Sequence, residues 1–350
     1  MSIIGQRKID HLALCATSEI AFRNTTTLLE QVRFVHDALP ELDANAIDTS
    51  ITILKKRLRV PIFIAAMTGG TEEAAHVNRQ LSQIAEERGY GFGLGSQRAM
   101  HVQRDAEWTY SVRAFAKHTL VLGNLGVVHA KRMSTDEIAA LVARVEADAL
   151  CIHLNPAMEL VQPGGDRDFT GGLETIDRLV RELDVPIIVK ETGCGLSRSV
   201  GARLRSAGVA HVDVSGAGGT SWVAVETKRA EQAADARAAA IGHALWDWGI
   251  PTGASVGMLA PLGFQTIIAT GGIATGVDVA RAIALGASAA GLARPVLRAF
   301  HAGGRDGVLA FFDGIEAELR AVMLLTGSAN IEALRRAPRV LGSELRAWLE

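Results

Sequence analysis

Eight short apolar runs recur along this 350-residue chain, and their number constrains the fold more than any other feature. Each run is rich in Val, Ile, Leu or Ala without strict alternation, which is typical of strands buried on both faces of a parallel sheet. The runs are Val60–Ala66, Tyr90–Ser96, Thr119–Gly126, Ala149–Asn155, Pro186–Glu191, His211–Gly216, Phe264–Gly272 and Ala289–Pro295.

Helical patterns fill the gaps between these runs. Apolar residues in 74–85 fall on one helical face, and Gly89 ends that helix. Ser134 precedes Glu137 by three residues, the spacing of a capping box, and an apolar helical pattern follows. Eight strand–helix units favour an α/β fold, a closed (β/α)8 TIM barrel forming one domain over residues 1–350. An open, doubly wound sheet is the structural alternative.

Two segments lie outside the bare repeat. Residues 1–59 precede the first strand and form an N-terminal extension that we expect to plug or cover one end of the barrel. Residues 220–263 are too long for one helix, and we expect an inserted helix followed by a loop punctuated by Gly and Pro. Insertions of this kind in barrels often act as lids.

The composition excludes several classes of protein. The net charge is −2, and no basic or acidic block indicates nucleic acid or a membrane surface as a partner. Aromatic residues make up 5% of the chain, which argues against base stacking. Three cysteines without metal-ligand spacing suit a reducing compartment, and the N-terminus has no signal-peptide pattern. We therefore expect a cytoplasmic enzyme without a membrane span.

Polar and glycine residues follow seven of the eight predicted strands, at the end where barrel enzymes place their active sites. These strand ends are Met67–Gly70, Gly95–Arg98, Gly123–Asn124, His153–Glu159, Lys190–Gly193, Ser215–Trp222 and Thr270–Gly272. One or two could be plain turns. The glycines of Thr270–Gly276 open a helix after the seventh strand, where free backbone N–H groups bind phosphate. The loop Ser215–Thr220 is a second glycine cradle beside it.

Several side chains at these ends suggest a phosphorylated substrate. Lys190 ends a buried strand, where it could pair with Glu191 or Asp213 or stabilise negative charge on a flavin ring. His153 and Asn155 point the same way at period two, and Glu159 and Asp166 offer hard oxygen donors for Mg²⁺ beside a diphosphate. A solvated acidic loop is the alternative. Arg7, Lys8 and Arg98 are candidates for neutralising phosphates.

Taken in order, the motifs of the chain resemble the type 2 isopentenyl diphosphate isomerases over essentially its whole length. They include RKIDH (Arg7–His11), GLGSQRAM (Gly93–Met100), HLNPAMELVQPGGD (His153–Asp166), DVSGAGGTSW (Asp213–Trp222) and GGIATG (Gly271–Gly276). Each motif alone is weak, but their succession is specific. The resemblance implies a flavin barrel that uses reduced FMN and Mg²⁺, with NADPH as the reductant, and forms a homotetramer or octamer. It also implies a prenyl diphosphate substrate and interconversion of isopentenyl and dimethylallyl diphosphate without net redox change.

The resemblance assigns roles to individual positions of this chain. FMN contacts are implied for Ala66, Met67, Thr68, Ser96, Asn124, Lys190, Ser215, Thr220, Gly272, Ile273, Ala274, Leu292 and Ala293. Diphosphate contacts are implied for Arg7, Lys8, Ser96, Gln97 and Arg98. The catalytic pocket is expected to contain His11, His153, Asn155 and Met158, with Glu159 as the Mg²⁺ ligand.

The chain departs from the family pattern at three places. Met158 stands where the family has a glutamine, Gly164 stands where it has a glutamate, and Ala274 stands where it has an arginine. A thioether has no proton to give, so Met158 cannot relay one as an amide could. Two hypotheses follow: isomerisation survives with a weaker assist, because reduced flavin itself supplies and removes the proton, or the scaffold performs another non-redox reaction of a prenyl diphosphate, such as cyclisation.

Other flavin-barrel enzymes remain as a further alternative. An FMN-dependent oxidoreductase acting on a 2-hydroxy acid would need a His–Arg pair at the substrate, and the sequence identifies none clearly. A cysteine-based nucleotide dehydrogenase would need a cysteine after the sixth strand, and Ser215–Trp222 contains none. A binding protein without turnover is the remaining class, against which the presence of His153, Asn155 and Glu159 argues.

Overall fold

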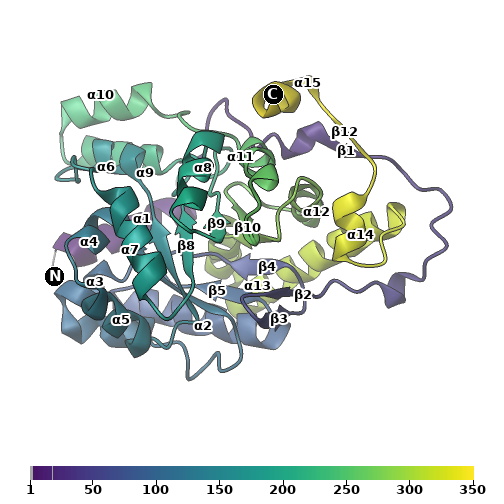
Figure 1. The fold of residues 1–350 in the computed structure, drawn as a ribbon. Coiled ribbons are helices and arrows are strands. Elements are labelled where there is room, and N and C mark those ends of the chain that lie inside the picture. Colours follow the sequence, from purple (N-terminus) through teal and green to yellow (C-terminus); the bar gives the residue numbers. More distant parts are fainter. Residues whose placement is uncertain (1–2, 18) are drawn as a thin grey trace.

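The computed structural model describes residues 3–17 and 19–350, and at its centre eight parallel strands form a closed barrel (Figure 1). The barrel excludes the doubly wound alternative, and every strand lies inside one of the eight predicted runs. The strands are β4 (Ile62–Ile64), β5 (Gly91–Gly93), β6 (Val121–Gly126), β7 (Ala149–His153), β8 (Ile187–Lys190), β9 (His211–Asp213), β10 (Thr266–Thr270) and β11 (Ala289–Leu292). Their order around the barrel is β10-β11-β4-β5-β6-β7-β8-β9.

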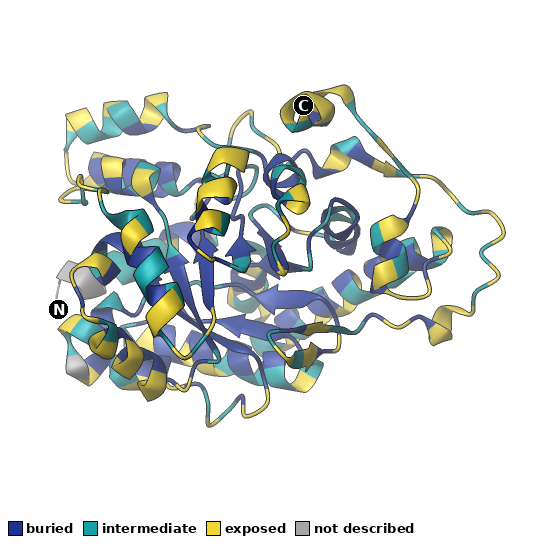
Figure 2. Cartoon of the chain, viewed as in Figure 1, coloured by how far each residue is buried: buried dark blue, intermediate teal, exposed yellow. Residues whose placement is uncertain are grey.

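Helices follow the strands and cover the outside of the barrel, as the chain pattern predicted. Figure 2 shows the barrel strands as buried and the surrounding helices as mixed, with exposed residues on their outer faces. The helices after the strands are α2 (Glu72–Arg88), α3 (Arg98–Val102), α4 (Val127–Lys131), α5 (Thr135–Arg144), α6 (Pro156–Val161), α7 (Gly172–Glu182), α8 (Arg198–Ser206), α9 (Trp222–Gln232), α10 (Ala236–Ala244), α11 (Thr252–Leu259), α12 (Gly276–Ala284) and α13 (Arg294–Leu325). The C-terminal part adds α14 (Ile331–Arg336), β12 (Arg339–Leu341) and α15 (Ser343–Leu349), and short 3-10 turns lie at Leu29–Gln31, Ala44–Ala46, Arg104–Tyr110 and Ala260–Leu262. In the part of the chain described, no helix combines the length and apolar character needed to cross a membrane.

Two helix-end predictions are confirmed. Gly89 ends α2 at φ 66°, a left-handed conformation in which glycine meets no steric cost. Ser134 and Glu137 form the full capping box of α5, each side chain accepting from the other residue's backbone N–H.

The N-terminal extension serves both ends of the barrel rather than one. Its elements are α1 (Ile3–Thr17), β1 (Val32–Phe34), β2 (Ile51–Ile53) and β3 (Lys56–Leu58). The β2–β3 hairpin places Ile53 and Leu58 in an apolar cluster inside the amino end of the barrel, together with Phe63, Leu122 and Cys151. Helix α1 instead packs against α9 and α13 at the carboxyl end of the strands.

The segment 220–263 contains more helix than the sequence predicted. Instead of one helix and a loop it forms α9, α10 and α11, with α9 packed against α1, α6 and α10. Part of the segment expected to be a loop punctuated by Gly and Pro is helical, and Gly257 lies inside α11. A Cβ there would lie 2.6 Å from Leu349 Cδ2, so this glycine lets α15 pack closely on α11.

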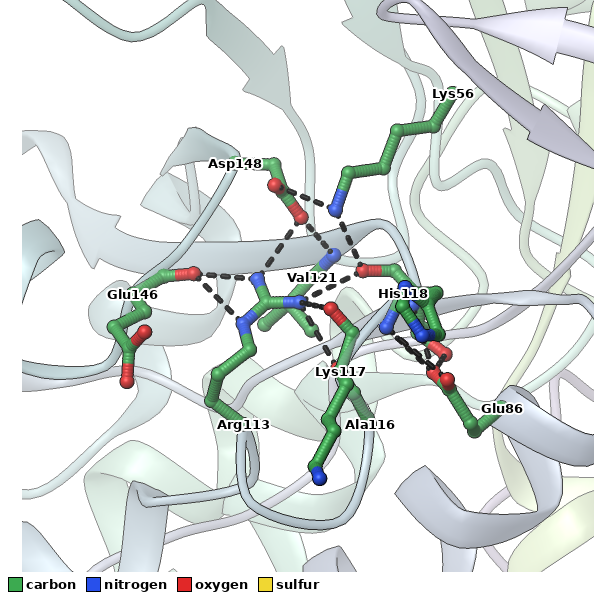
Figure 3. A network of polar contacts seen from close by, with 10 residues as sticks. Lys56, Glu86, Arg113, Ala116, Lys117, His118, Val121, Glu146 and Asp148 are labelled. Atoms are coloured by element: carbon green, nitrogen blue, oxygen red, sulfur yellow. Dashed lines mark hydrogen bonds and ion pairs between the residues drawn. The ribbon is translucent and has the colours of Figure 1, made fainter.

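A polar network fastens the hairpin to the amino end of the barrel (Figure 3). Asp148, just before β7, accepts hydrogen bonds from the Val121 backbone N–H at 2.8 Å and from Arg113 at 3.0 Å. Its other oxygen lies 2.7 Å from Lys56 Nζ, which belongs to β3. These charged hydrogen bonds lower the pKa of Asp148 against the raising effect of burial.

Asp148→Asn is expected to lower the free energy of unfolding by about 2–3 kcal/mol at pH 7, because it breaks an ion pair and leaves Lys56 and Arg113 partly unpaired. Because the pKa of Asp148 is lower in the folded protein than in the unfolded chain, its ionised carboxylate stabilises the fold above the unfolded-state pKa of about 4. This stabilisation is lost as the pH falls through the folded-state pKa of Asp148. Urea denaturation should therefore show a difference in unfolding free energy between the wild type and Asp148→Asn that becomes smaller below about pH 4. The control is Asp177→Asn, whose exposed partner Arg181 makes a surface pair. Equal losses from both variants would contradict a structural role for the network.

Candidate functional site

A cavity of about 630 Å³ opens at the carboxyl ends of the barrel strands, where the sequence placed the active site. Side chains of a strand alternate at period two, so the side chain two residues after one in the apolar interior layer again points into the barrel. Asn124 follows Leu122, His153 follows Cys151 and Lys190 follows Ile188 in this way. The floor of the cavity is therefore polar although the rest of the barrel interior is apolar.

The structure brings nearly all of the predicted site residues to this cavity. Those that line it are Arg7, Lys8, His11, Ala66, Met67, Thr68, Ser96, Arg98, Asn124, His153, Asn155, Met158, Glu159, Lys190, Ser215, Thr220, Gly272, Ile273, Ala274 and Ala293. Helix α1 supplies the first three, more than a hundred residues before β7 in the chain. Its Leu12 and Cys15 also face the cavity, so α1 roofs the mouth of the barrel.

Two predicted contacts, Gln97 and Leu292, do not line the cavity. Gln97 is 1% exposed, donates to the Leu141 carbonyl at 3.1 Å and accepts from the Asn124 backbone N–H at 2.9 Å. It therefore positions Asn124 instead of facing a diphosphate. Leu292 is fully buried in the layer between strands and helices, while its neighbours Gly291 and Ala293 reach the cavity.

His153 is held in one orientation by Asn124. The Asn124 amide nitrogen donates to the Leu94 carbonyl at 3.0 Å, so its Oδ1 is the atom 2.8 Å from His153 Nδ1 and accepts from it. This assigns the proton to Nδ1 and leaves Nε2 as an acceptor. Burial, followed by the positive charge of Lys190, lowers the pKa of His153 to about 3. The ring is consequently neutral at physiological pH.

Glu159 lies on α6 with its carboxylate held from two sides. Oε1 accepts from Asn155 Nδ2 at 2.9 Å, and Oε2 accepts from Gln162 Nε2 at 3.2 Å and the Asp166 N–H at 2.8 Å. Gln162 Oε1 is buried without a hydrogen-bond partner in the described chain. Residues 3–17 and 19–350 contain no cluster of three His, Cys, Asp or Glu side chains for a metal. The donors fit a hard cation such as Mg²⁺ only if the substrate and water complete its ligands, as is usual at phosphate sites.

Three cations gather on one side of the cavity. Arg7 and Lys8 come from α1, and Arg98 begins α3 after β5; no ion pair engages any of them within the described residues. The Nε atoms of Arg7 and Arg98 are buried without hydrogen-bond partners. Burial, and after it the neighbouring Arg7, lowers the pKa of Lys8 to about 8. Such a cluster is costly alone and is stabilised by a multivalent anion.

A second cationic pair lies elsewhere in the same cavity. Arg294 and Arg298 stand in the first turns of α13, after β11, and both line the cavity. Their Nε atoms donate to the carbonyls of Cys15 and Ala16 at the end of α1, at 3.0 and 3.4 Å. The sequence analysis missed both, because nothing in the strand pattern shows which face of a following helix turns inward.

The glycine loops after β9 and β10, which line the cavity, meet backbone to backbone. A Cβ on Gly219 would lie 2.4 Å from the Gly272 nitrogen, and one on Gly271, which has φ 103°, would lie 2.2 Å from the Gly216 carbonyl oxygen. Only glycine permits this approach. Thr68 Oγ1, also facing the cavity, is buried without a partner in the described chain. This open backbone cradle, the orphaned hydroxyl and Lys190 on the floor fit a phosphorylated cofactor such as FMN.

His11 is fixed by a carboxylate that the sequence analysis did not single out. Its Nε2 lies 2.8 Å from Glu226 Oε1, and Glu226 has no exposed side-chain surface and also pairs with Arg229 at 2.7 Å. The ring meets Trp222 edge-on at 5.1 Å. Burial lowers the pKa of His11, while the bond to Glu226 opposes that effect. Glu226 lies one helical turn after Trp222 on α9, the only sequence signal that could have indicated it.

Comparison with known proteins agrees with this geometry. A family model described as FMN-dependent dehydrogenase matches residues 2–154 and 154–340. The chain is 40% identical over 348 residues to an isopentenyl-diphosphate delta-isomerase of Methanothermobacter thermautotrophicus, covering 99% of this chain and 96% of the relative. It is 43% identical over 342 residues to the enzyme of that name from Methanosarcina barkeri, covering 97% and 93%. The corresponding protein of a Nostoc species is 42% identical over 338 residues, covering 95% and 94%.

Solved structures share the fold at lower identity. A mandelate oxidase with (S)-2-phenylpropionate superposes with a TM-score of 0.63 at 20% identity, covering 97% of each chain. A mandelate oxidase mutant with a monooxide FMN adduct gives a TM-score of 0.66 at 21% identity, covering 95% of each chain. These neighbours confirm the TIM-barrel fold alone. From the full-length identities, the chain belongs to the type 2 isopentenyl-diphosphate delta-isomerases, an isomerase family within the FMN-dependent dehydrogenases.

Proposed function

We propose that this protein catalyses the FMN- and Mg²⁺-dependent isomerisation of isopentenyl diphosphate to dimethylallyl diphosphate in isoprenoid biosynthesis. One observation carries the proposal: a single cavity contains two cationic clusters on different elements. Arg7, Lys8 and Arg98 suit a diphosphate, while Arg294 and Arg298 line the same cavity as a glycine cradle that suits a cofactor phosphate. A cavity with two such clusters can hold a phosphorylated cofactor and a phosphorylated substrate together.

On the cofactor side, the flavin ring would contact Lys190, Thr68, Ser96 and Asn124. The FMN phosphate would contact the glycine loops. When bound in reduced form, FMN supplies an electron-rich ring that stabilises positive charge and can exchange protons. Lys190 would supply a cation that stabilises negative charge on the ring. The position of Lys190 on a strand keeps that cation fixed.

On the substrate side, the cations of α1 and α3 would hold the diphosphate, and Glu159 would bind a Mg²⁺ ion that neutralises part of its charge. The reaction would add a proton to the terminal alkene carbon, giving a tertiary cation at the next carbon. It would then remove a proton from the chain carbon on the other side of that cation, with no net redox change. Neutral His153, oriented by Asn124, presents Nε2 as an acceptor and adds no positive charge that would oppose a substrate cation. His11, Asn155 and Met158 would line the rest of the reacting end.

Anaerobic incubation with FMN, dithionite, Mg²⁺ and isopentenyl diphosphate, followed by NMR, tests the function. Dimethylallyl diphosphate formed at an ordinary enzymic rate is the expected result. Binding without turnover, seen as a diphosphate-dependent change of the reduced flavin spectrum, would instead favour the second candidate, a different non-redox reaction of a prenyl diphosphate. That candidate rests on Met158, which gives the cavity an apolar wall on α6.

Met158→Gln is expected to raise the isomerisation kcat about tenfold, because an amide can relay a proton and general acid–base assistance is worth this much or more. Leu160→Gln on the same helix is the control, since Leu160 is 41% exposed and outside the cavity lining. An unchanged kcat for Met158→Gln would show that this position does not limit the reaction.

The affinity for isopentenyl diphosphate is expected to fall as the pH rises above about 8. Below the lowered pKa of about 8, Lys8 is charged and ready to bind an anion. Above it, binding must first restore a proton to Lys8, which costs up to about tenfold in affinity per pH unit. Calorimetric titration from pH 7 to 9 checks this. The decline should disappear in Lys8→Met and persist in Lys117→Met, a substitution of an exposed lysine.

Three further parts of the proposal rest on the family resemblance. NADPH would reduce the flavin, the protein would act as a homotetramer or octamer, and the enzyme would be cytoplasmic. Flavin reduction kinetics with NADPH and NADH, and light scattering of the purified protein, test the first two directly.

A further inference from the structure

His129 is a cavity residue that the proposed function leaves without a role. It lies on α4, the short helix that directly follows β6, and faces the same cavity as Arg98 and Met158. Its Nε2 atom is buried and has no hydrogen-bond partner within the described chain. A buried polar atom without a partner is costly, so this nitrogen indicates a ligand atom in the cavity.

The neighbours of His129 define the kind of ligand. Arg98 and His101 face it from α3, with the two imidazole rings 5.1 Å apart and edge-on. Arg132, at the end of α4, and Asp166, after α6, also act on it, but these two form an ion pair of 2.8 Å with each other. The surroundings of His129 are therefore positive on balance. An oxygen-rich anion satisfies both this charge and the free nitrogen.

Buried nitrogens of Arg7 and Arg98 lack partners in the same cavity. Together with His129 Nε2 they form three unsatisfied nitrogens around one region, contributed by α1, α3 and α4. The other two histidines of the cavity differ, because His11 uses a ring nitrogen on Glu226 and His153 uses one on Asn124. His129 alone among these three histidines leaves a buried, unpartnered ring nitrogen beside the arginines, within the chain described.

We propose that His129 Nε2 donates a hydrogen bond to the substrate diphosphate and that the ring takes up a proton as the diphosphate binds. This deepens the proposed function and depends on its diphosphate site. Burial, then Arg98, His101 and Arg132, lower the pKa of His129 to about 4 in the protein alone, while Asp166 opposes them. A bound diphosphate offsets the arginine charge and raises that pKa. At a pH between the pKa of His129 in the free protein and its pKa in the complex, binding consumes a proton. The affinity for the diphosphate therefore rises as the pH falls through this range.

Isothermal titration calorimetry of the FMN-loaded protein with inorganic pyrophosphate and Mg²⁺ tests the proposal. Titrations at about pH 6, in buffers of different ionisation enthalpy, give the number of protons taken up, and at this pH Lys8 is already charged. His129→Gln is compared with the same substitution at exposed His118, at the opposite end of the barrel. We expect His129→Gln to bind pyrophosphate about tenfold more weakly and to lose the extra proton uptake, with His118→Gln like wild type.

The outcomes separate this proposal from the proposed function. Pyrophosphate binding with equal affinity and equal proton uptake in wild type and His129→Gln overturns the role of His129 and leaves the diphosphate site standing. Absence of pyrophosphate binding in the wild type overturns both. If His129→Gln does not retain FMN or shows no cooperative melting transition, His129→Asn is used in its place. The wild type alone also tests the proposal: if the number of protons taken up on binding is no greater than the number taken up by pyrophosphate itself, the proposal is refuted.

Discussion

Replacement of Lys190 by methionine is expected to lower the isomerisation kcat of the FMN-loaded protein by about a hundredfold or more, the usual loss when one fixed charge-stabilising donor is removed. Lys190 is 9% exposed, lines the cavity floor and donates to the Glu191 carbonyl at 2.6 Å, so it is held in place before any ligand arrives. The affinity for FMN should fall as well, because the ring would lose the cation that Lys190 is expected to supply.

Anaerobic assays at saturating FMN, quenched at set times, give the kcat, and titration of the flavin fluorescence gives the FMN affinity. Lys117→Met, at an exposed lysine away from the cavity, controls for loss of a positive charge. Burial raises the pKa of Asp213 and Lys190 opposes this, so the melting temperature must be measured beside activity. Wild-type kcat and FMN affinity in a folded Lys190→Met would show that the flavin ring does not lie against this side chain.

Replacement of Arg98 by methionine is expected to raise the KM for isopentenyl diphosphate about 30- to 100-fold with little change in kcat. A charge-assisted hydrogen bond to phosphate is worth about 1.5–3 kcal/mol, and a contact remote from the reacting carbons binds the ground and transition states alike. Arg98 Nε is buried and unpartnered in the described chain, so the variant removes a group prepared for an anion.

Steady-state kinetics at two ionic strengths check this prediction, since the wild-type affinity should decrease more with salt than that of Arg98→Met. Arg181→Met is the matched control, because Arg181 is 66% exposed and pairs with Asp177 on the surface of α7. A lowered kcat with an unchanged KM would place Arg98 at the reacting end of the substrate and not at its diphosphate.

Helix α1, which roofs the barrel mouth, carries residues of one cationic cluster and contacts residues of the other. Arg294 and Arg298 bind the last carbonyls of α1, and the same helix carries Arg7, Lys8 and His11 into the cavity. One helix therefore connects the residues expected to hold the cofactor phosphate with those expected to hold the substrate diphosphate.

The sequence by itself determined the barrel and most of the cavity. Strands buried on both faces appear in the sequence as continuous apolar runs, and the segments between them have the pattern of capped helices with one apolar face. Few folds other than the barrel accommodate eight such units. Since parallel strands of a barrel end on one side, the polar residues that follow β6, β7 and β8 had to meet there. Gly219 and Gly271 were likewise readable, because only glycine tolerates their backbone approach.

Only the tertiary structure decided which side chains face the cavity from outside the strands. Gln97 was predicted as a ligand of the diphosphate but turns to Asn124 and Leu141. His129 and Arg294 carried no signal, although the fold brings both to the cavity. Glu226, marked only by its spacing from Trp222, is fully buried against His11. Their positions depend on how a helix is rotated after its strand and on contacts between segments far apart in the chain. No local pattern records either quantity, because both are set by packing against the completed barrel.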